Sequence, residues 1–295
     1  MKNLKNSILG VCFMLCFNLF GQTIPEVQFS TVQNQEQNVA EESRYLLADR
    51  VYLRNCDGTS CKKRGVLAIG TKLTVLEKSE KTLVINGIQS NWYKVRTQDN
   101  EGWIWGGFIA QKSFGSQANA DIKFVFGRES TAQDSTGFLT EYYQLRAFKN
   151  GVELDKIVFA APTLQPFEVK SIGNRGVYNL EDIITLHIPC MGGCGCTTGD
   201  MYVFYNNNKF NHVATLTGFA DAEYSENETF IFPSDMEGKK GLIIKKSNRI
   251  DEQYLLDGDE SKVRRKVLTT FYKWSAGKLI ETSIAPVVAS YDINI

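Results

Sequence analysis

Alternation of apolar and polar residues dominates the chain beyond residue 121 and predicts strands rather than helices. Residues 143–147 alternate in this way, and the alternation resumes over residues 152–154 after Asn150–Gly151. Asn–Gly between two alternating runs is a strong signal for a β-hairpin, because both central positions of the tight turn need positive φ. The pattern therefore predicts an antiparallel hairpin centred on Asn150–Gly151.

The same patterning predicts more strands along the rest of the chain, and no segment has a convincing amphipathic-helix pattern. Two further hairpins join residues 201–205 to 210–216 through Asn206–Asn208, and 268–274 to 278–281 through Ser275–Gly277. Other predicted strands are 122–126, 182–188, 229–232 and 241–246. Such runs separated by turns are typical of an antiparallel sandwich or barrel. We therefore expect an all-β fold in which residues 122–295 form a larger, antiparallel β-sandwich-like domain.

Residues 44–112 form a separate, denser series of short predicted strands. Val51 and Leu53 alternate with Tyr52 and Arg54, and glycines interrupt the segment that follows. About 65 residues make a small core, which large aromatic side chains help to fill. The flanking residues 23–43 and 113–121 are polar in composition and predict two linkers.

The first 22 residues have the pattern of a secretory signal peptide. Lys2 and Lys5 precede an apolar run from Ile8 to Phe20, which is short for a membrane span of about 20 residues. Residues 1–22 thus predict export to the periplasm, the cell surface or the medium, with no stable membrane span after cleavage. An uncleaved membrane anchor is the alternative.

The charge of the chain bears on one class of partner. Lys plus Arg and Asp plus Glu both total 33 over the chain, and only residues 41–112 have a mild excess of basic residues. This balance gives no reason to expect nucleic acid as a partner.

Four stretches of residues 44–112 resemble the bacterial SH3 family (SH3b). They are VYLR at 51–54, GVLAIGTKLTV at 65–75, WYKV at 92–95 and GWIWGGFI at 102–109. The resemblance implies a small SH3-like β-barrel that attaches an exported protein to peptidoglycan, to another envelope polymer or to an envelope protein. It also implies a ligand groove beside the loop that follows the Leu–Arg strand. By position, the candidates to line this groove are Tyr52, Arg54, Trp92 and Trp105, although aromatic residues in so small a barrel also serve as core.

Export changes the interpretation of the cysteines, because close pairs outside the cytosol usually form disulfides. Cys56 and Cys61 flank an Asp57–Gly58 turn in the predicted groove loop, and we expect a disulfide between them. Such a cross-link would stiffen a binding loop.

A second cluster of cysteines lies at Cys190, Cys194 and Cys196, shortly after His187. We favour a disulfide from Cys190 to Cys194 or Cys196, with one thiol left free or paired with another molecule. Two alternatives remain: a zinc site made by His187 and the three thiolates, and a redox-active or dimerising thiol. His187 occupies an alternate position of an apolar strand and is expected to be a buried histidine.

No catalytic motif is present in the sequence. The chain has two histidines, His187 and His212, and no G-x-S-x-G elbow, P-loop or H-E-x-x-H motif. We therefore expect a non-enzymatic binding protein without a cofactor. The alternative is an envelope hydrolase in which the SH3-like unit targets an unrecognised β-fold catalytic domain, since a pair of catalytic carboxylates leaves no sequence motif.

Overall fold

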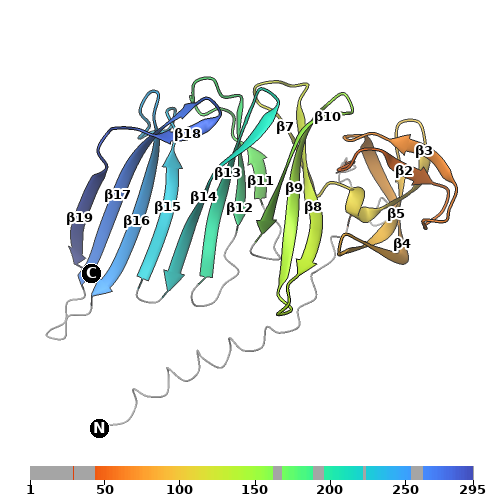
Figure 1. Ribbon diagram of the computed structural model, residues 1–295, viewed down its shortest axis with the longest axis horizontal. Helices are drawn as coiled ribbons and strands as arrows, with labels where there is room; N and C mark the ends of the chain where they lie inside the picture. The colour runs from red at the N-terminus through yellow and green to blue at the C-terminus, as the bar shows by residue number, and fades with distance from the viewer. Residues whose placement is uncertain are drawn as a thin grey trace, which may run out of the picture.

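The protein is built from strands, as the computed structural model in Figure 1 shows. The structure describes Phe29 and residues 44–161, 168–188, 196–221, 224–253 and 262–294. The predicted all-β class is confirmed, and the signal peptide predicted at 1–22 lies outside the described residues. Within those residues, no helix has the length and apolar character needed to cross a membrane.

Residues 44–110, which we call the small module, form a curled sheet with the strand order β1-β4-β5-β6-β2-β3. Its strands are β1 (Arg44–Tyr45), β2 (Val51–Arg54), β3 (Lys63–Leu67), β4 (Lys72–Ile85), β5 (Ile88–Arg96) and β6 (Glu101–Trp105), followed by the 3-10 turn η2 (Gly106–Phe108). The pairing of β4 with β5 shifts register twice, between Val75 and Glu77 and between Lys78 and Thr82. Such irregularities bend a strand, which helps the sheet to close on itself.

The core of the small module follows the alternation predicted for β2. Val51 and Leu53 are buried while Tyr52 is exposed. Phe29 also belongs to this core, because it is buried and its ring packs edge-to-face on that of Tyr93 at 5.3 Å. The polar composition of residues 23–43 predicts a linker, but this one apolar side chain is part of the module.

A second sheet has the order β10-β9-β8-β7. Its strands are β7 (Lys112–Gly115), β8 (Lys123–Gln133), β9 (Leu139–Lys149) and β10 (Val152–Ala161). Residues 113–121 were expected to form a linker, whereas residues 112–115 form β7 and pair with β8. The reason is Phe114, whose ring lies 5.4 Å from that of Phe124 at the edge of the core.

The third sheet has nine antiparallel strands and occupies most of the C-terminal half. They are β11 (Glu168–Ser171), β12 (Asp182–Ile188), β13 (Cys196–Asn206), β14 (Lys209–Asp221), β15 (Tyr224–Ile231), β16 (Ile243–Gln253), β17 (Lys262–Ser275), β18 (Lys278–Glu281) and β19 (Val287–Asn294). The strands follow this sequence across the sheet, except that β18 and β19 both pair with β17.

The three predicted hairpins are confirmed. Asn150–Gly151, Asn207–Asn208 and Ala276–Gly277 all have positive φ at both positions of the turn. They join β9 to β10, β13 to β14 and β17 to β18. Gly and Asn tolerate this left-handed backbone, which matches the twist of the flanking strands.

The two larger sheets pack face to face, as expected of a sandwich. Phe124, Phe126 and Leu145 of the four-stranded sheet share one buried cluster with Leu186 and Val203 of the nine-stranded sheet. The opposite face of the nine-stranded sheet is also buried. There, side chains of β13 and β14 pack with Phe230 of β15 and with partly buried residues of β17 and β18, so the sheet curls around a second core.

A separate buried cluster joins the small module to the four-stranded sheet. Leu47, Ile69 and Ala110 of the module pack with Val125 of β8 and Phe148 of β9 in one buried cluster. A backbone hydrogen bond from Thr131 N to Asn86 O, 2.9 Å long, adds a second contact. The module therefore lies against the sheet rather than at the end of a spacer.

Candidate binding groove of the small module

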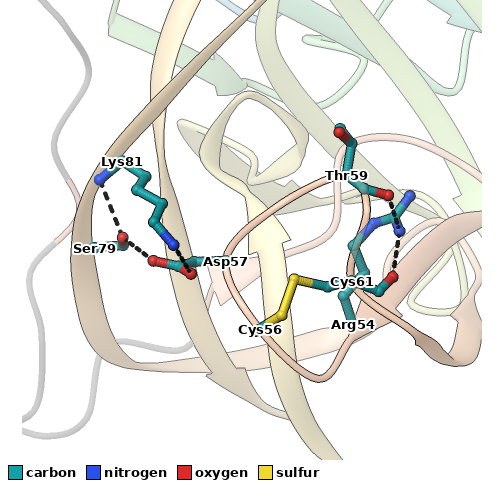
Figure 2. Close-up of a disulfide and its surroundings, with 7 residues drawn as sticks. All are labelled: Arg54, Cys56, Asp57, Thr59, Cys61, Ser79 and Lys81. Atoms are coloured by element: carbon teal, nitrogen blue, oxygen red, sulfur yellow. Dashed lines mark hydrogen bonds and ion pairs between the residues drawn. A yellow bond between two sulfur atoms is a disulfide. The ribbon is translucent and has the colours of Figure 1, made fainter.

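The loop that follows β2 is closed by the expected disulfide. Cys56 and Cys61 are bonded, with their Cα atoms 5.6 Å apart (Figure 2). Inside the loop, Cys61 N donates to Gly58 O at 3.2 Å, and at its base Asn55 N donates to Lys62 O at 3.1 Å. These bonds give the short loop a defined shape before any ligand arrives.

Arg54 stabilises this loop from within. Its Nη1 donates to the carbonyl oxygens of Thr59, at 2.6 Å, and Cys61, at 2.8 Å. These backbone acceptors would otherwise need water. The sequence proposed Arg54 as a lining residue, and in the structure its guanidinium is hydrogen-bonded to the backbone of the loop itself.

Asp57 connects the tip of the loop to β4. Lys81 Nζ lies 2.8 Å from Asp57 Oδ1, and the Ser79 hydroxyl donates to the other carboxylate oxygen (Figure 2). The hydrogen bond from Lys81, followed by that from Ser79, holds the pKa of the Asp57 carboxyl below its ordinary value of 3.8. The carboxylate is therefore charged throughout the physiological range and fixes the loop against β4.

A shallow groove of about 430 Å³ lies between this loop and β4. One wall is the loop itself from Asp57 to Cys61, the other is Lys81–Leu83, and Trp92 of β5 lies at its base. The lining combines hydroxyl residues with the Asp57–Lys81 pair and one indole, and such a surface suits a peptide or a glycan. We call this surface the loop groove.

The four predicted lining residues fall into two contacting pairs, and only Trp92 is part of the loop groove. Trp92 reaches the loop groove although it is only 5% exposed. Trp105 is 3% exposed, and its Nε1 donates to Leu83 O at 2.9 Å and to Ser90 O at 3.2 Å. Trp105 is thus a core residue that supports Trp92, its partner across the β5–β6 pair.

Tyr52 is the predicted residue that is open to solvent, being 43% exposed. Lys63 Nζ lies 3.6 Å from the centroid of its ring, and Arg54 Cζ lies 5.9 Å from it. Both cations cover the aromatic face. The structure does not assign Tyr52 to the loop groove, and its role as a contact residue stays a prediction.

The sequence offered no signal for Ser79 and Lys81. They lie more than twenty residues from Asp57, where the pairing of β4 with β5 shifts register, and both contact its carboxylate. Only the pairing of β4 with β5 brings these groups to the groove.

The second cysteine cluster lies largely outside the described residues. Cys190 and Cys194 are not described, and Cys196 is the first residue of β13. The disulfide from Cys190 to Cys194 or Cys196 stays a prediction. Among the residues that the structure describes, no group of three or more His, Cys, Asp or Glu could hold a metal ion.

His187 differs from its expected state. The sequence predicts a buried histidine, but the side chain is 45% exposed and its Nδ1 lies 2.9 Å from Asp200 Oδ1. The two residues face each other across β12 and β13. The apolar neighbours of His187 alternate with it, so its own side chain points away from the sandwich core.

Comparison with known proteins identifies one part of the chain. Residues 49–110 match the family of bacterial SH3 domains. No curated protein and no solved structure matches the chain. The small module is therefore a bacterial SH3 domain, and the family extends over the strands that form the loop groove.

Proposed function

We propose that this protein is exported and uses its bacterial SH3 domain to bind, without catalysis, a component of the cell envelope. The ligand we expect is peptidoglycan, another envelope polymer or an envelope protein. The family match supports this proposal, because bacterial SH3 domains are binding modules that often act at the cell wall.

The observation that carries the proposal is the disulfide-closed loop from Cys56 to Cys61 beside Trp92. The disulfide, the two hydrogen bonds from Arg54 and the Asp57–Lys81 ion pair all act on the same short loop. Fixing a loop before binding lowers the entropy that is lost on binding. Four separate restraints on an exposed loop are hard to explain by the stability of the module alone.

Co-sedimentation of the full mature chain with purified peptidoglycan sacculi tests the proposal. Ser60 is exposed in the lining of the loop groove, so Ser60→Trp should fill it and reduce the bound fraction by about tenfold or more. Gln98→Trp places the same side chain in the exposed turn between β5 and β6 and should bind normally.

Two results would contradict the proposal. If Ser60→Trp bound sacculi as well as wild type does, the loop groove would not be the binding site. Release of soluble fragments from the sacculi by the wild-type chain would favour the envelope hydrolase instead.

A further inference from the structure

A second hollow lies in the C-terminal half, at one end of the curled nine-stranded sheet. It has a volume of about 800 Å³ and is lined by the segment before β12, the β13–β14 turn and the β17–β18 turn. These connections lie at the same end of the sheet, at the top of Figure 1. We call it the turn-lined hollow, and none of the four predicted site residues contributes to it.

Aromatic rings form part of its wall. Tyr178 is 80% exposed, which is unusual for so large a ring, and Trp274 is partly buried beside the hollow. Trp274 is fixed from below by Phe204, whose ring centroid lies 4.9 Å away in an edge-to-face contact. The face of an aromatic ring is electron-rich and attracts polarised C–H groups, such as those on the flat face of a sugar ring.

Asparagines make up half of the remaining residues of the wall. Asn179, Asn206, Asn207 and Asn211 all line the hollow. Each amide has a carbonyl that accepts and an NH₂ group that donates two hydrogen bonds. Neighbouring hydroxyls on a sugar also donate and accept, so asparagine amides can bind them in pairs.

Charge argues against an ionic ligand. Lys209 is the charged residue of the lining, and its Nζ is paired with Asp155 Oδ1 at 2.9 Å. Among the residues that the structure describes around this hollow, no Asp, Glu, His or Cys belongs to the lining. The wall is therefore suited to holding an uncharged, hydroxyl-rich molecule rather than to transferring protons.

The hollow is formed before any ligand binds. Asn179, Asn207 and Ala276 all have φ near 50° in tight turns, and Asn207 N donates to Glu181 Oε1 at 3.0 Å. Left-handed turns between paired strands leave little freedom to rearrange. Preformed hollows at the open end of a curled sheet are common places for small ligands.

We propose that the turn-lined hollow binds an uncharged carbohydrate chain, with Tyr178 and Trp274 against the sugar rings and the asparagine amides on the hydroxyls. This site is separate from the loop groove of the SH3 domain. The two proposals therefore succeed or fail independently.

The test is binding of the full mature chain to an array of uncharged glycans, followed by titration calorimetry with the soluble oligosaccharides that bind. We expect Tyr178→Ala to weaken binding by about tenfold or more, since one stacked ring is lost. Its exposed side chain makes few structural contacts, so the thermal unfolding midpoint should not change. Tyr291→Ala is the matched control, because Tyr291 is also exposed but lies outside the hollow.

Ser60→Trp should bind the same oligosaccharide normally, which separates this site from the loop groove. The proposal is overturned if no uncharged glycan binds, or if Tyr178→Ala binds as well as wild type. Tighter binding of an acidic oligosaccharide, such as a galacturonate hexamer, or of peptides at Tyr178 would also overturn it.

Discussion

The loop groove and the turn-lined hollow are held in shape by different means. The first depends on the Cys56–Cys61 disulfide and an ion pair at the rim of a small barrel. The second depends on tight turns above a large aromatic core that includes Phe204 and Phe230. In this molecule the loop of the small domain is fixed by local cross-links, whereas the turns of the large sheet are fixed by the core beneath them.

The largest expected effect concerns the core beneath the turn-lined hollow. Phe204 is fully buried and contacts Trp274 and Phe232. Phe204→Ala should lower the free energy of unfolding by about 3–5 kcal/mol, because it removes a large apolar side chain and leaves a cavity. Denaturant unfolding measures this loss. Phe138→Ala, at a 63% exposed ring, should change stability by about 0.5 kcal/mol or less, and a similar loss in both variants would refute the argument.

The second prediction concerns the joint between the small module and the four-stranded sheet. Gly87 has φ +77°, and a Cβ there would lie 2.3 Å from Thr131 O of β8. Gly87→Ala should therefore cost about 2–3 kcal/mol, from backbone strain together with a displaced contact. Gly241 has φ +73° in the connection between β15 and β16, and a Cβ there would meet nothing within 4 Å. Gly241→Ala should cost about 1 kcal/mol, and equal losses in the two variants would show that the joint is not tight.

The disulfide should matter less to stability than to the shape of the loop. Cys56→Ser with Cys61→Ser should lower the free energy of unfolding by about 2 kcal/mol, because the loop it closes is short. Hydrogen exchange of the amides at residues 57–61 should accelerate, while exchange around Asn207 should not. Slower or unchanged exchange of the loop amides in the double variant would show that Arg54 and Asp57 hold the loop without the disulfide.

The smallest expected effect is a pH dependence confined to the loop groove. The Asp57 carboxylate is favoured in the folded state, so its contribution is complete above the ordinary pKa of 3.8 and is lost as the pH falls through the lowered value. The contribution is about 1 kcal/mol or less, since Lys81 is mostly exposed. The hydrogen-exchange protection factors of the loop amides should therefore fall as the pH drops below 3.8 in wild type, and should show no such step in Asp57→Asn.

Sequence patterns predicted what is local in this fold. The turn at Asn150–Gly151 needs only its own two residues to adopt positive φ, and the Cys56–Cys61 loop closes over a few residues. Phe29 was missed because a single apolar residue in a polar segment has no periodicity, and its partner Tyr93 is far along the chain. Strand β7 was missed for the same reason, since only Phe114 marks its inward face.

The candidate sites show the same limit. Trp92 and Trp105 look equivalent in sequence and lie directly opposite each other on β5 and β6, but only Trp92 lines the loop groove. The turn-lined hollow was not predicted at all. Its walls come from three turns, and their meeting depends on the order of strands in the sheet.

The joint between the SH3 domain and the sheet also sets how two attachments would combine. Ala110 is buried at the joint and β7 begins at Lys112, so no flexible tether separates the domain from the rest. In tethered proteins the local concentration of the second ligand varies with tether length. Here the separation and orientation of the loop groove and the turn-lined hollow are fixed. If both sites were occupied at once, avidity would be strong only on a surface that presents the two ligands at the matching spacing.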